Sequence, residues 1–512
     1  MKIIFLTTVL FLSFSLHAQT GLQRTYSSGV QNIIAGLIPY SNGYAVAGIS
    51  NFGYDSSWLH LILLNADGNV AAQQTWRGAL PLTFMDHAAG LTSGFLVCGV
   101  GSPNLGDFHP YLIKTDNSGI VQWSKWFDNL GFSSHQLNAI VTNGNAFSVY
   151  SYPDGGTQGF YRIEGDETGS SFSAVSATNP SGNMRISNAV PFSTVSDHLL
   201  IASGGLVPNV HGSDGLLIKM NPSGVSWSKL FHFGSIISEE FTDAVISAGD
   251  NPIAVAYSQN DTTTVVTSFV MKLTSSGAIT WCRKLALGSI LEMFTIEETS
   301  SGDLLVAGID ANYGGILIKL SSIGDLIWAR RWTPSAYTLT YFTKIHRDAS
   351  TNDIIVSGTH DAKFMVLHLD ENGDGCEFEN ITGMQVNDFT PVLQDLPLTV
   401  SGFTPTTQTE TLHDRTSAIT IQDVCQTGIE PAVSGDHPGA SPNPAHDVIT
   451  VSLPSSFAKA SLNLFDATGR KVYSAITKNT RSEITVTNMQ RGIYLLEIIS
   501  DDKQWREKIM VQ

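Results

Sequence analysis

The sequence predicts an all-β protein that consists of a seven-bladed β-propeller followed by a small Ig-like β-sandwich. Three observations lead to this prediction. The composition has 46 glycines, 42% hydrophobic residues and 14% charged residues, which indicates a folded chain with many short turns. An apolar strand followed by a glycine-containing turn recurs about every 50 residues. Residues 441–512 break this repeat and show short strands of alternating apolar and polar residues.

The start of the chain has the pattern of a secretory signal peptide. Lys2 precedes an apolar run over residues 3–16, and the small residue Ala18 precedes Gln19. We therefore expect residues 1–18 to be removed on export. A membrane anchor is the alternative, and it is disfavoured because the run is shorter than the roughly 18 residues that span a bilayer. No later apolar stretch approaches that length, so no transmembrane segment is expected after cleavage.

Seven related units are predicted for the propeller, residues 19–379. Each has an apolar strand, a polar turn with a glycine and a strand that usually carries a tryptophan, as in Ile316-Leu317-Ile318-Lys319-Leu320 through Gly324 to Trp328. A period of 47 to 55 residues between turn glycines fits four short antiparallel strands, which make one propeller blade. The turn glycines are Gly68, Gly119, Gly169, Gly224, Gly277, Gly324 and Gly373.

The recurring residues are expected to build the fold rather than a binding or catalytic site. A tryptophan on the outer strand packs its large ring against the next blade. The glycine supplies the positive φ of a tight turn. The lysines Lys114, Lys219, Lys272 and Lys319 are expected to lie along a blade with their ammonium groups in solvent.

One unit has a spacing that points to a known repeat. Asp116 precedes Gly119 by three residues, and Trp123 follows that glycine by four. This spacing resembles the PQQ-like and related β-propeller repeats, and the resemblance covers roughly residues 25–380. Quinone-dependent members of that class have eight blades and often adjacent cysteines. This chain has seven units and no Cys-Cys pair, so we expect no quinone and no other cofactor.

A β-rich tail packed on the propeller is predicted for residues 380–425, followed by a Pro/Gly/Ser-rich linker over residues 426–440. Cys376 and Cys425 bracket the tail. In an exported protein, a disulfide between these cysteines is one expectation, and it would pin the tail to the last blade. Cys98 and Cys282 lie inside predicted strands and are expected to be buried thiols.

Residues 441–512 contain four short motifs in order. They are Pro442-Asn443-Pro444, then Asp466 with Gly469 and Arg470, then Gly492 with Tyr494, and finally Lys508 near the end. The segment resembles the type A C-terminal sorting domain of the type IX secretion system of Bacteroidetes. The resemblance implies recognition by the outer-membrane translocon and sorting machinery, removal of the segment, and a passenger that is released or attached to surface lipopolysaccharide. An ordinary Ig-like adhesion module is the alternative.

The chain is acidic, which argues against nucleic acid as a partner. The whole sequence has 28 Lys and Arg against 45 Asp and Glu, a net charge of −17. Residues 441–512 carry nine basic and seven acidic residues, so the acidic excess lies in the propeller, tail and linker. Nucleic acid is not an expected partner, because phosphate-binding chains show a basic surface.

Two sets of acidic residues are candidates for a binding or catalytic site. Asp370, Asn372, Asp374 and Gly375 have the spacing that begins a calcium loop. However, Ile381 stands where that loop needs a bidentate Glu, and the segment coincides with a turn of the repeat. Asp86, Asp107 and Asp243 fall near blade ends, and two of them follow Phe84 and Phe241 by two residues.

The predicted function follows from the export signals and the fold. No serine-hydrolase, phosphate-loop, dinucleotide or paired-histidine motif occurs in a fitting context, so we do not predict an enzyme. We expect an extracellular or cell-surface binding or adhesion scaffold that recognises a protein or glycan ligand. The alternative is a secreted polysaccharide hydrolase or lyase that uses acidic residues in the propeller channel.

Overall fold

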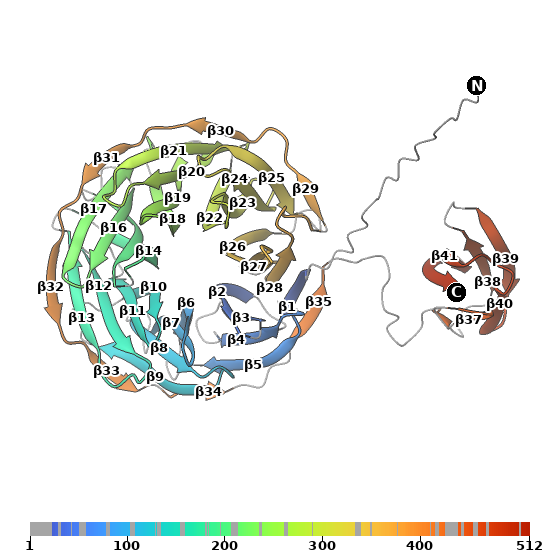
Figure 1. Ribbon diagram of the computed structural model, residues 1–512. Helices are drawn as coiled ribbons and strands as arrows, with labels where there is room; N and C mark the ends of the chain where they lie inside the picture. The colour runs from blue at the N-terminus through green and yellow to red at the C-terminus, as the bar shows by residue number, and fades with distance from the viewer. Residues whose placement is uncertain are drawn as a thin grey trace, which may run out of the picture. The chain divides into compact units, whose positions relative to one another are not determined.

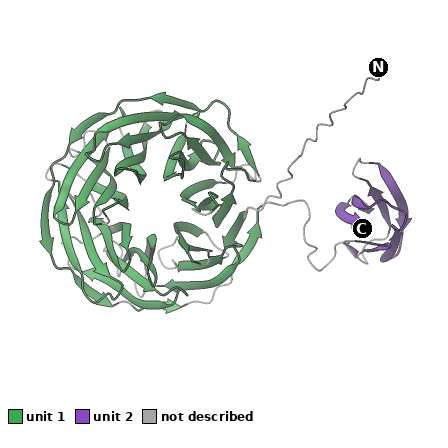
Figure 2. Ribbon diagram, in the orientation of Figure 1, with its two compact units in different colours: residues 1–424 green, residues 425–512 purple. Residues whose placement is uncertain are grey.

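The chain folds into two compact units, residues 1–424 and residues 425–512, and each is described by itself (Figure 2). The computed structural model describes residues 23–28, 32–41, 43–50, 58–77, 82–102, 108–128, 130, 135–153, 159–179, 182, 184–194, 196–205, 213–234, 238–260, 265–288, 290–332, 339–348, 351–375, 377–409, 411–414, 419–424, 439–441, 445–453, 459–466, 470–500 and 503–511. For residues 82–86, 135–136, 260, 439 and 503–504 it describes the backbone alone.

Several predictions concern residues outside this set. The signal peptide, Cys376 and Cys425, and residues 426–438 of the linker are not among the described residues. Over the part of the chain that is described, all regular structure is β-strand, and a helix long and apolar enough to cross a membrane is not found there.

The first unit has a propeller-like fold. Its described strands form seven antiparallel sheets of five strands, which are arranged in a ring (Figure 1). The first strand of each sheet lies nearest the ring axis and contacts the first strands of both neighbouring sheets. These inner strands are β2 (Asn32–Tyr40), β6 (Leu82–Leu91), β10 (His135–Asn143), β14 (Met184–Pro191), β18 (Ser238–Ser247), β22 (Leu291–Glu298) and β26 (Thr340–Arg347).

The second and third strands of each sheet are covered by neighbouring sheets on both faces. In β7, all nine residues from Gly94 to Ser102 are buried, which explains why such strands read as continuous apolar runs. The second strands are β3 (Gly43–Ser50), β7 (Gly94–Ser102), β11 (Ala146–Pro153), β15 (His198–Gly204), β19 (Asn251–Asn260), β23 (Leu304–Asp310) and β27 (Ile354–His360). The third strands are β4 (Trp58–Asn65), β8 (His109–Thr115), β12 (Gly159–Asp166), β16 (Asp214–Asn221), β20 (Val265–Leu273), β24 (Gly315–Leu320) and β28 (Lys363–Leu369).

The fourth strand closes each sheet, and in the seventh sheet it comes from the start of the chain. Here β1 (Gln23–Ser27) pairs with β28, so both ends of the ring meet in one sheet. Tyr26 of β1 is fully buried in a cluster with Ile34 and Phe364, between the seventh and first sheets. The remaining fourth strands are β5 (Val70–Arg77), β9 (Val121–Asp128), β13 (Ser173–Thr178), β17 (Gly224–His232), β21 (Ile279–Ala286) and β25 (Leu326–Trp332).

An outer belt, residues 378–423, adds the fifth strand of every sheet. The belt runs around the ring in the reverse of chain order, from the sixth sheet through the first to the seventh (Figure 1). Four strands were expected in each unit, and the belt makes them five. Its strands are β29 (Phe378–Asn380), β30 (Gln385–Asp388), β31 (Val392–Asp395), β32 (Thr399–Phe403), β33 (Thr406–Thr409), β34 (His413–Asp414) and β35 (Thr420–Asp423).

Recurring tryptophans pack against the neighbouring sheet, as predicted, and four of them do so at a turn glycine: Trp123 at Gly169, Trp227 at Gly277, Trp281 at Gly324 and Trp328 at Gly373. A Cβ atom added at Gly169 or Gly373 would lie 2.7 Å from the ring of Trp123 or Trp328, respectively. Both glycines have positive φ, at 59° and 69°. At Gly169 and Gly373 a larger residue would therefore collide with the indole ring and also be strained by the positive φ.

The prediction for the lysines is wrong at Lys114. Its side chain is 2% exposed, and Nζ donates hydrogen bonds to Thr115 O at 2.7 Å and to Ser93 O at 3.2 Å. Lys219 and Lys319 are also mostly buried, with Nζ 3.8 Å and 3.5 Å from the carboxylates of Asp197 and Asp303. Lys114 is buried because neighbouring sheets pack closely on both faces of β8, the third strand of the second sheet.

The second unit contains two antiparallel sheets that share one core. One sheet has the order β36 (Gly439–Ser441), β37 (Val448–Ser452) and β40 (Arg481–Thr485). The other has the order β39 (Lys471–Thr477), β38 (Ala460–Phe465), β41 (Gly492–Ser500) and β42 (Lys503–Val511). Ile449, Leu462, Ile484 and Leu496 are buried in that shared core.

Candidate functional site

A β-bulge at the same place in each described inner strand shapes the axial side of the ring. In every sheet the pairing of the first strand with the second shifts by one residue, for example between Phe241 and Asp243. A bulge inserts an unpaired residue and redirects the side chains that follow it. The hydroxyl groups of two bulged residues, Ser187 and Thr242, donate to the carbonyl oxygens of Phe241 and Met293 in the next sheet, at 2.7 and 2.9 Å.

Asp243 directly follows the bulge of β18 and is 6% exposed. One carboxylate oxygen accepts hydrogen bonds from Asn188 Nδ2 at 2.6 Å and from the Ala244 amide at 3.0 Å. The other accepts from Thr295 Oγ1 at 2.8 Å and from the Ile296 amide at 3.3 Å. Four donors from three neighbouring inner strands therefore hold this buried carboxylate in one orientation.

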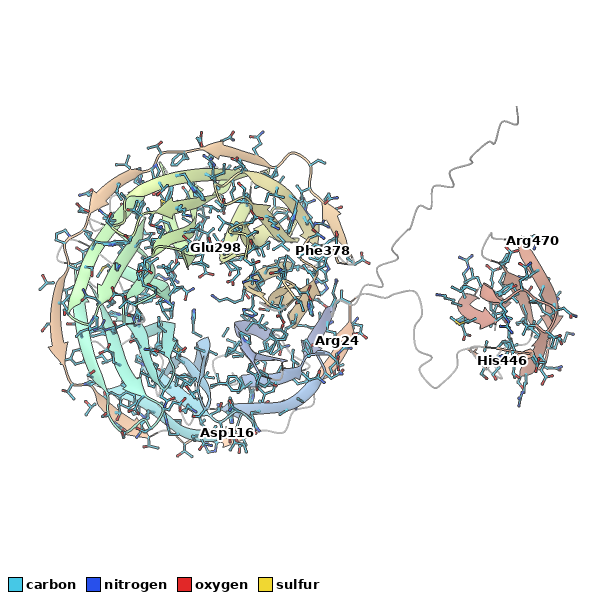
Figure 3. The ribbon with its side chains drawn as sticks, viewed as in Figure 1. Arg24, Asp116, Glu298, Phe378, His446 and Arg470 are labelled. Carbon is cyan, nitrogen blue, oxygen red and sulfur yellow. The ribbon has the colours of Figure 1, made fainter. Side chains whose placement is uncertain are left out.

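A cavity of about 470 Å³ opens beside Asp243. Four successive inner strands, β14, β18, β22 and β26, supply its lining. Its polar residues are Asn188, Asp243, Thr295, Glu297, Glu298 and Lys344, and apolar residues such as Val190 and Ile345 complete the wall. Figure 3 shows Glu298 at the inner edge of the ring. We call this the axial cavity.

The carboxyl groups of the axial cavity differ in their electrostatic surroundings. Burial and, after it, the nearby charge of Asp243 raise the pKa of Glu297 to about 7, and the charge of Arg347 acts in the opposite direction. Burial also raises the pKa of Glu298, and Lys272 opposes that shift. Near neutral pH, Glu297 can therefore accept or donate a proton.

A second cluster of polar residues lies where the inner strands β14, β18 and β22 begin. Tyr257 donates a hydrogen bond to Glu240 Oε2 at 3.1 Å, and Arg185 Nε donates to the Tyr152 hydroxyl at 3.0 Å. Burial, followed by the charge of Glu240, raises the pKa of Glu292. The polar side chains at this end therefore bond within two pairs, Tyr257 with Glu240 and Arg185 with Tyr152.

One cluster of metal-binding residue types occurs among the described residues. His232 Nδ1 lies 3.1 Å from Asp214 Oδ1 and 3.3 Å from Glu239 Oε2. Glu239 is 1% exposed, and its Oε2 also accepts a hydrogen bond from the Phe233 amide at 2.7 Å. The imidazole thus lies within ion-pair distance of two carboxylates.

The segment with the spacing of a calcium loop forms a turn of the repeat, as expected. Asp370 Oδ1 accepts hydrogen bonds from the amides of Asn372 at 2.9 Å and Asp374 at 2.8 Å, and the Gly373 amide donates to Asp370 O at 2.9 Å. The carboxylate of Asp374 pairs with Arg330. These contacts occupy the acidic groups within the turn, and Ile381 instead donates its amide to Ala329 O at 2.9 Å.

Of the three acidic residues predicted near blade ends, Asp243 is at the axial cavity. Asp107 and the side chain of Asp86 lie outside what the structure describes. Sequence reasoning missed Asn188, Thr295 and Lys344. A signal for them exists, because these residues and Asp243 occupy the same position after the bulge in four successive inner strands.

The predicted sorting motifs are partly described. Pro442, Asn443, Pro444 and Gly469 are outside the described residues. Asp466 directly follows β38, and its carboxylate accepts hydrogen bonds from Arg470 Nε at 3.0 Å and from the Arg470 amide at 3.1 Å. Gly492 begins β41, and the buried Tyr494 donates its hydroxyl to Gln490 O at 2.7 Å. Asp466, Tyr494 and Lys508 line a second cavity, of about 540 Å³.

Comparison with solved structures gives low overall similarity. The crystal structure of Sqt1 from Chaetomium thermophilum aligns with a TM-score of 0.37 and 10% identity, over 67% of this chain and 97% of that one. The crystal structure of dimeric latent PorU from Porphyromonas gingivalis aligns with a TM-score of 0.13 and 13% identity, over 74% of this chain and 34% of that one. Among curated proteins, none matches the chain.

Comparison with protein families assigns the C-terminal segment. Residues 441–512 match the family described as a secretion system C-terminal sorting domain. The match covers the motifs on which the resemblance was based, and it supports a type IX sorting signal. The chain is therefore a secreted or cell-surface protein that carries a propeller-like passenger and interacts with the type IX secretion machinery through its C-terminal segment.

Proposed function

We propose that the chain is a binding protein: a seven-bladed β-propeller that reaches the cell surface by type IX secretion and binds a protein or glycan ligand in the axial cavity. The observation that carries this proposal is the convergence of six polar side chains from four inner strands on one cavity. Its volume, about 470 Å³, is within the range of small-ligand sites. A sugar unit or a single side chain of a protein partner has a suitable size.

The chemistry of the cavity favours a ligand with hydroxyl or cationic groups. Asp243 is oriented by four hydrogen bonds, so it presents a fixed negative charge without reorganising. Glu297 and Glu298 provide further acceptors, and Lys344, on the neighbouring inner strand, provides a donor. Hydroxyl groups can pair with both kinds of residue, whereas an ammonium group would pair with the carboxylates alone.

The test is to compare ligand capture by the full chain and its variants on a glycan array and on an array of basic peptides. Glu298→Gln and Lys344→Met change the cavity without removing a hydrogen bond that holds Asp243. Glu371→Gln, at an exposed turn, is the matched control. We expect at least a tenfold loss of binding for the two cavity variants and none for the control. Equal binding by all three variants would overturn the proposal.

A second candidate function, polysaccharide hydrolysis or elimination, is favoured by one observation. The pKa of Glu297 is raised to about 7 beside the charge of Asp243, and carboxyl groups in unequal surroundings can act as acid and base. Incubating the full chain with a panel of polysaccharides and measuring new reducing or unsaturated ends tests this function. Product formation that Glu297→Gln abolishes would support an enzyme, and no product across the panel would favour the binding protein.

A further inference from the structure

The outer face of the four-stranded sheet in the second unit carries exposed apolar side chains. Along β41, Tyr494, Leu496 and Ile498 point into the core, so the residues between them point outward. Ile493 is 46% exposed and Leu495 is 40% exposed. Two strands flank these residues in register, with Met510 of β42 beside Ile493, and Lys508 of β42 and Phe465 of β38 on either side of Leu495. We call these five residues, Phe465, Ile493, Leu495, Lys508 and Met510, the sorting face.

The sorting face surrounds a preformed cavity with a polar floor. Phe465, Ile493, Leu495 and Lys508 line the cavity of about 540 Å³. At its floor, Glu497 is 9% exposed and accepts hydrogen bonds from Arg506 Nε at 3.2 Å, Arg506 Nη2 at 3.0 Å and Asn463 Nδ2 at 3.3 Å. The floor is therefore held by its own ion pair, and the apolar side chains at the rim remain available to a partner.

Sorting motifs that are far apart in the sequence meet at this cavity. Asp466 and Lys508 both line it, and Arg470 is held against Asp466 by two hydrogen bonds. Gly492 begins the strand that carries Ile493 and Leu495. The segment as a whole matches the sorting-domain family, so a surface where its motifs converge is the place where recognition is expected.

The sorting face lies in the part of the chain that has a basic rather than an acidic excess. Lys508 and Arg506 line the cavity together with Asp466 and Glu497. Two further basic residues lie beside it: Arg470 bonds to Asp466, and Lys471 Nζ lies 5.6 Å from the centre of the Phe465 ring. Residues 441–512 have a small basic excess, whereas the whole chain has a net charge of −17. A partner with carboxylates would therefore be attracted to the sorting face and repelled by the passenger.

We infer that the sorting face is the surface that docks on the type IX machinery, and that the docking partner is a protein surface with apolar side chains flanked by carboxylates. The apolar residues of both partners are buried together, and Lys508 pairs with an acidic residue at the edge. Glu497 and Arg506 keep their internal pair and support the contact from below.

The experiment follows export of the full chain in a host with an active type IX system, by immunoblots of periplasm, cell surface and medium. Leu495→Glu and Lys508→Glu change the sorting face. Ile476→Glu is the apolar control, because Ile476 is 65% exposed on β39 and does not line the cavity. Lys478→Glu is the charge control, at an exposed residue between strands. Protease resistance of each variant reports whether the second unit is folded.

We expect the two sorting-face variants to accumulate in the periplasm in a protease-resistant form, with surface and medium protein reduced at least tenfold. Both control variants are expected to reach the surface as the unchanged chain does. If Leu495→Glu is protease-sensitive, the exposed charge reversal Lys508→Glu decides the result. Normal export of folded sorting-face variants, or equal retention of the controls, would overturn the inference.

Discussion

The indole of Trp328, on the fourth strand of the sixth sheet, lies against the backbone of Gly373 in the turn of the seventh sheet. The same relationship joins Trp123 to the turn at Gly169, where the indole Nε1 also donates a hydrogen bond to Glu167 O at 2.8 Å. Each such contact links one sheet to the next near the outside of the ring. The stability of the ring therefore depends on residues that repeat along the sequence.

Gly373→Ala is expected to destabilise the first unit by about 2–4 kcal/mol, because the new Cβ meets the Trp328 ring and the residue has a φ of 69°. Gly288→Ala is the matched control, since Gly288 has a φ of 64° and no atom within 4 Å of the added Cβ. The control is expected to lose only about 1–2 kcal/mol of backbone strain energy. Denaturant unfolding measures both, and equal losses would show that the indole contact contributes nothing.

The outer belt is aligned by pairs of opposite charge that face each other across the outermost strands. In three of these pairs the residues lie directly opposite each other in the strand register. The distances are 2.8 Å from Lys229 Nζ to Asp395 Oδ1, 3.0 Å from Arg331 Nη1 to Glu379 Oε1, and 2.6 Å from Arg24 Nε to Asp423 Oδ1. Arg283 and Asp388 form the same kind of pair. These pairs favour one register of each belt strand, because a shift by one residue separates the charges.

Lys229→Asp is expected to weaken attachment of β31 by about 0.5–1 kcal/mol, because it places two carboxylates opposite each other. Hydrogen exchange should accelerate at residues 392–395, while β32 keeps its rate. The charge-swapped double variant, Lys229→Asp with Asp395→Lys, should restore slow exchange. If the double variant exchanges as fast as the single one, the pair does not set the register.

Glu297 is expected to make the stability of the first unit depend on pH. Its pKa is about 7 in the folded chain against 4.5 as a model value, so the folded state binds the proton more tightly than the unfolded state. The free energy of unfolding should therefore fall as pH rises from about 4.5 to 7, by at most about 1.4 kcal/mol per pH unit from this group. Glu297→Gln should flatten this part of the profile in thermal unfolding, and an unchanged profile would contradict it.

Lys114 is expected to contribute to stability, although the sequence predicted that its ammonium group lies in solvent. Lys114→Met keeps the apolar contacts of the side chain but leaves the carbonyl oxygens of Ser93 and Thr115 without their donor. A loss of about 1–3 kcal/mol is expected. Lys272→Met, at a partly buried position of the same repeat, is the control and should cost less in the same unfolding experiment.

The sequence was sufficient for the features that repeat. Trp328 and Gly373 were predictable because contacts between adjacent sheets recur with the period of the chain. The outer belt was harder to predict in detail, because its strands span two to five residues and are largely exposed, as in β31 and β35. Their positions depend on partners far away in the sequence, such as Arg24 and Asp423, which no local pattern relates.

The candidate site was also predictable only in part. Asp243 was one of three acidic residues predicted near blade ends, and it follows Phe241 by two residues. Its partners Asn188 and Thr295 are chemically unlike it and belong to neighbouring sheets. Only the register of the inner strands, with a bulge at the same place in each, brings the three together. A comparison of units position by position is needed to find such sites.

The most direct test of the account is the location of the chain with and without residues 441–512. The full chain and a variant that ends at Ala440 would be produced in a host with an active type IX system and followed in periplasm, surface and medium. We expect the full chain to reach the surface or medium and the shortened chain to stay in the periplasm, because the sorting segment is missing. Surface delivery of the shortened chain in normal amounts would contradict it.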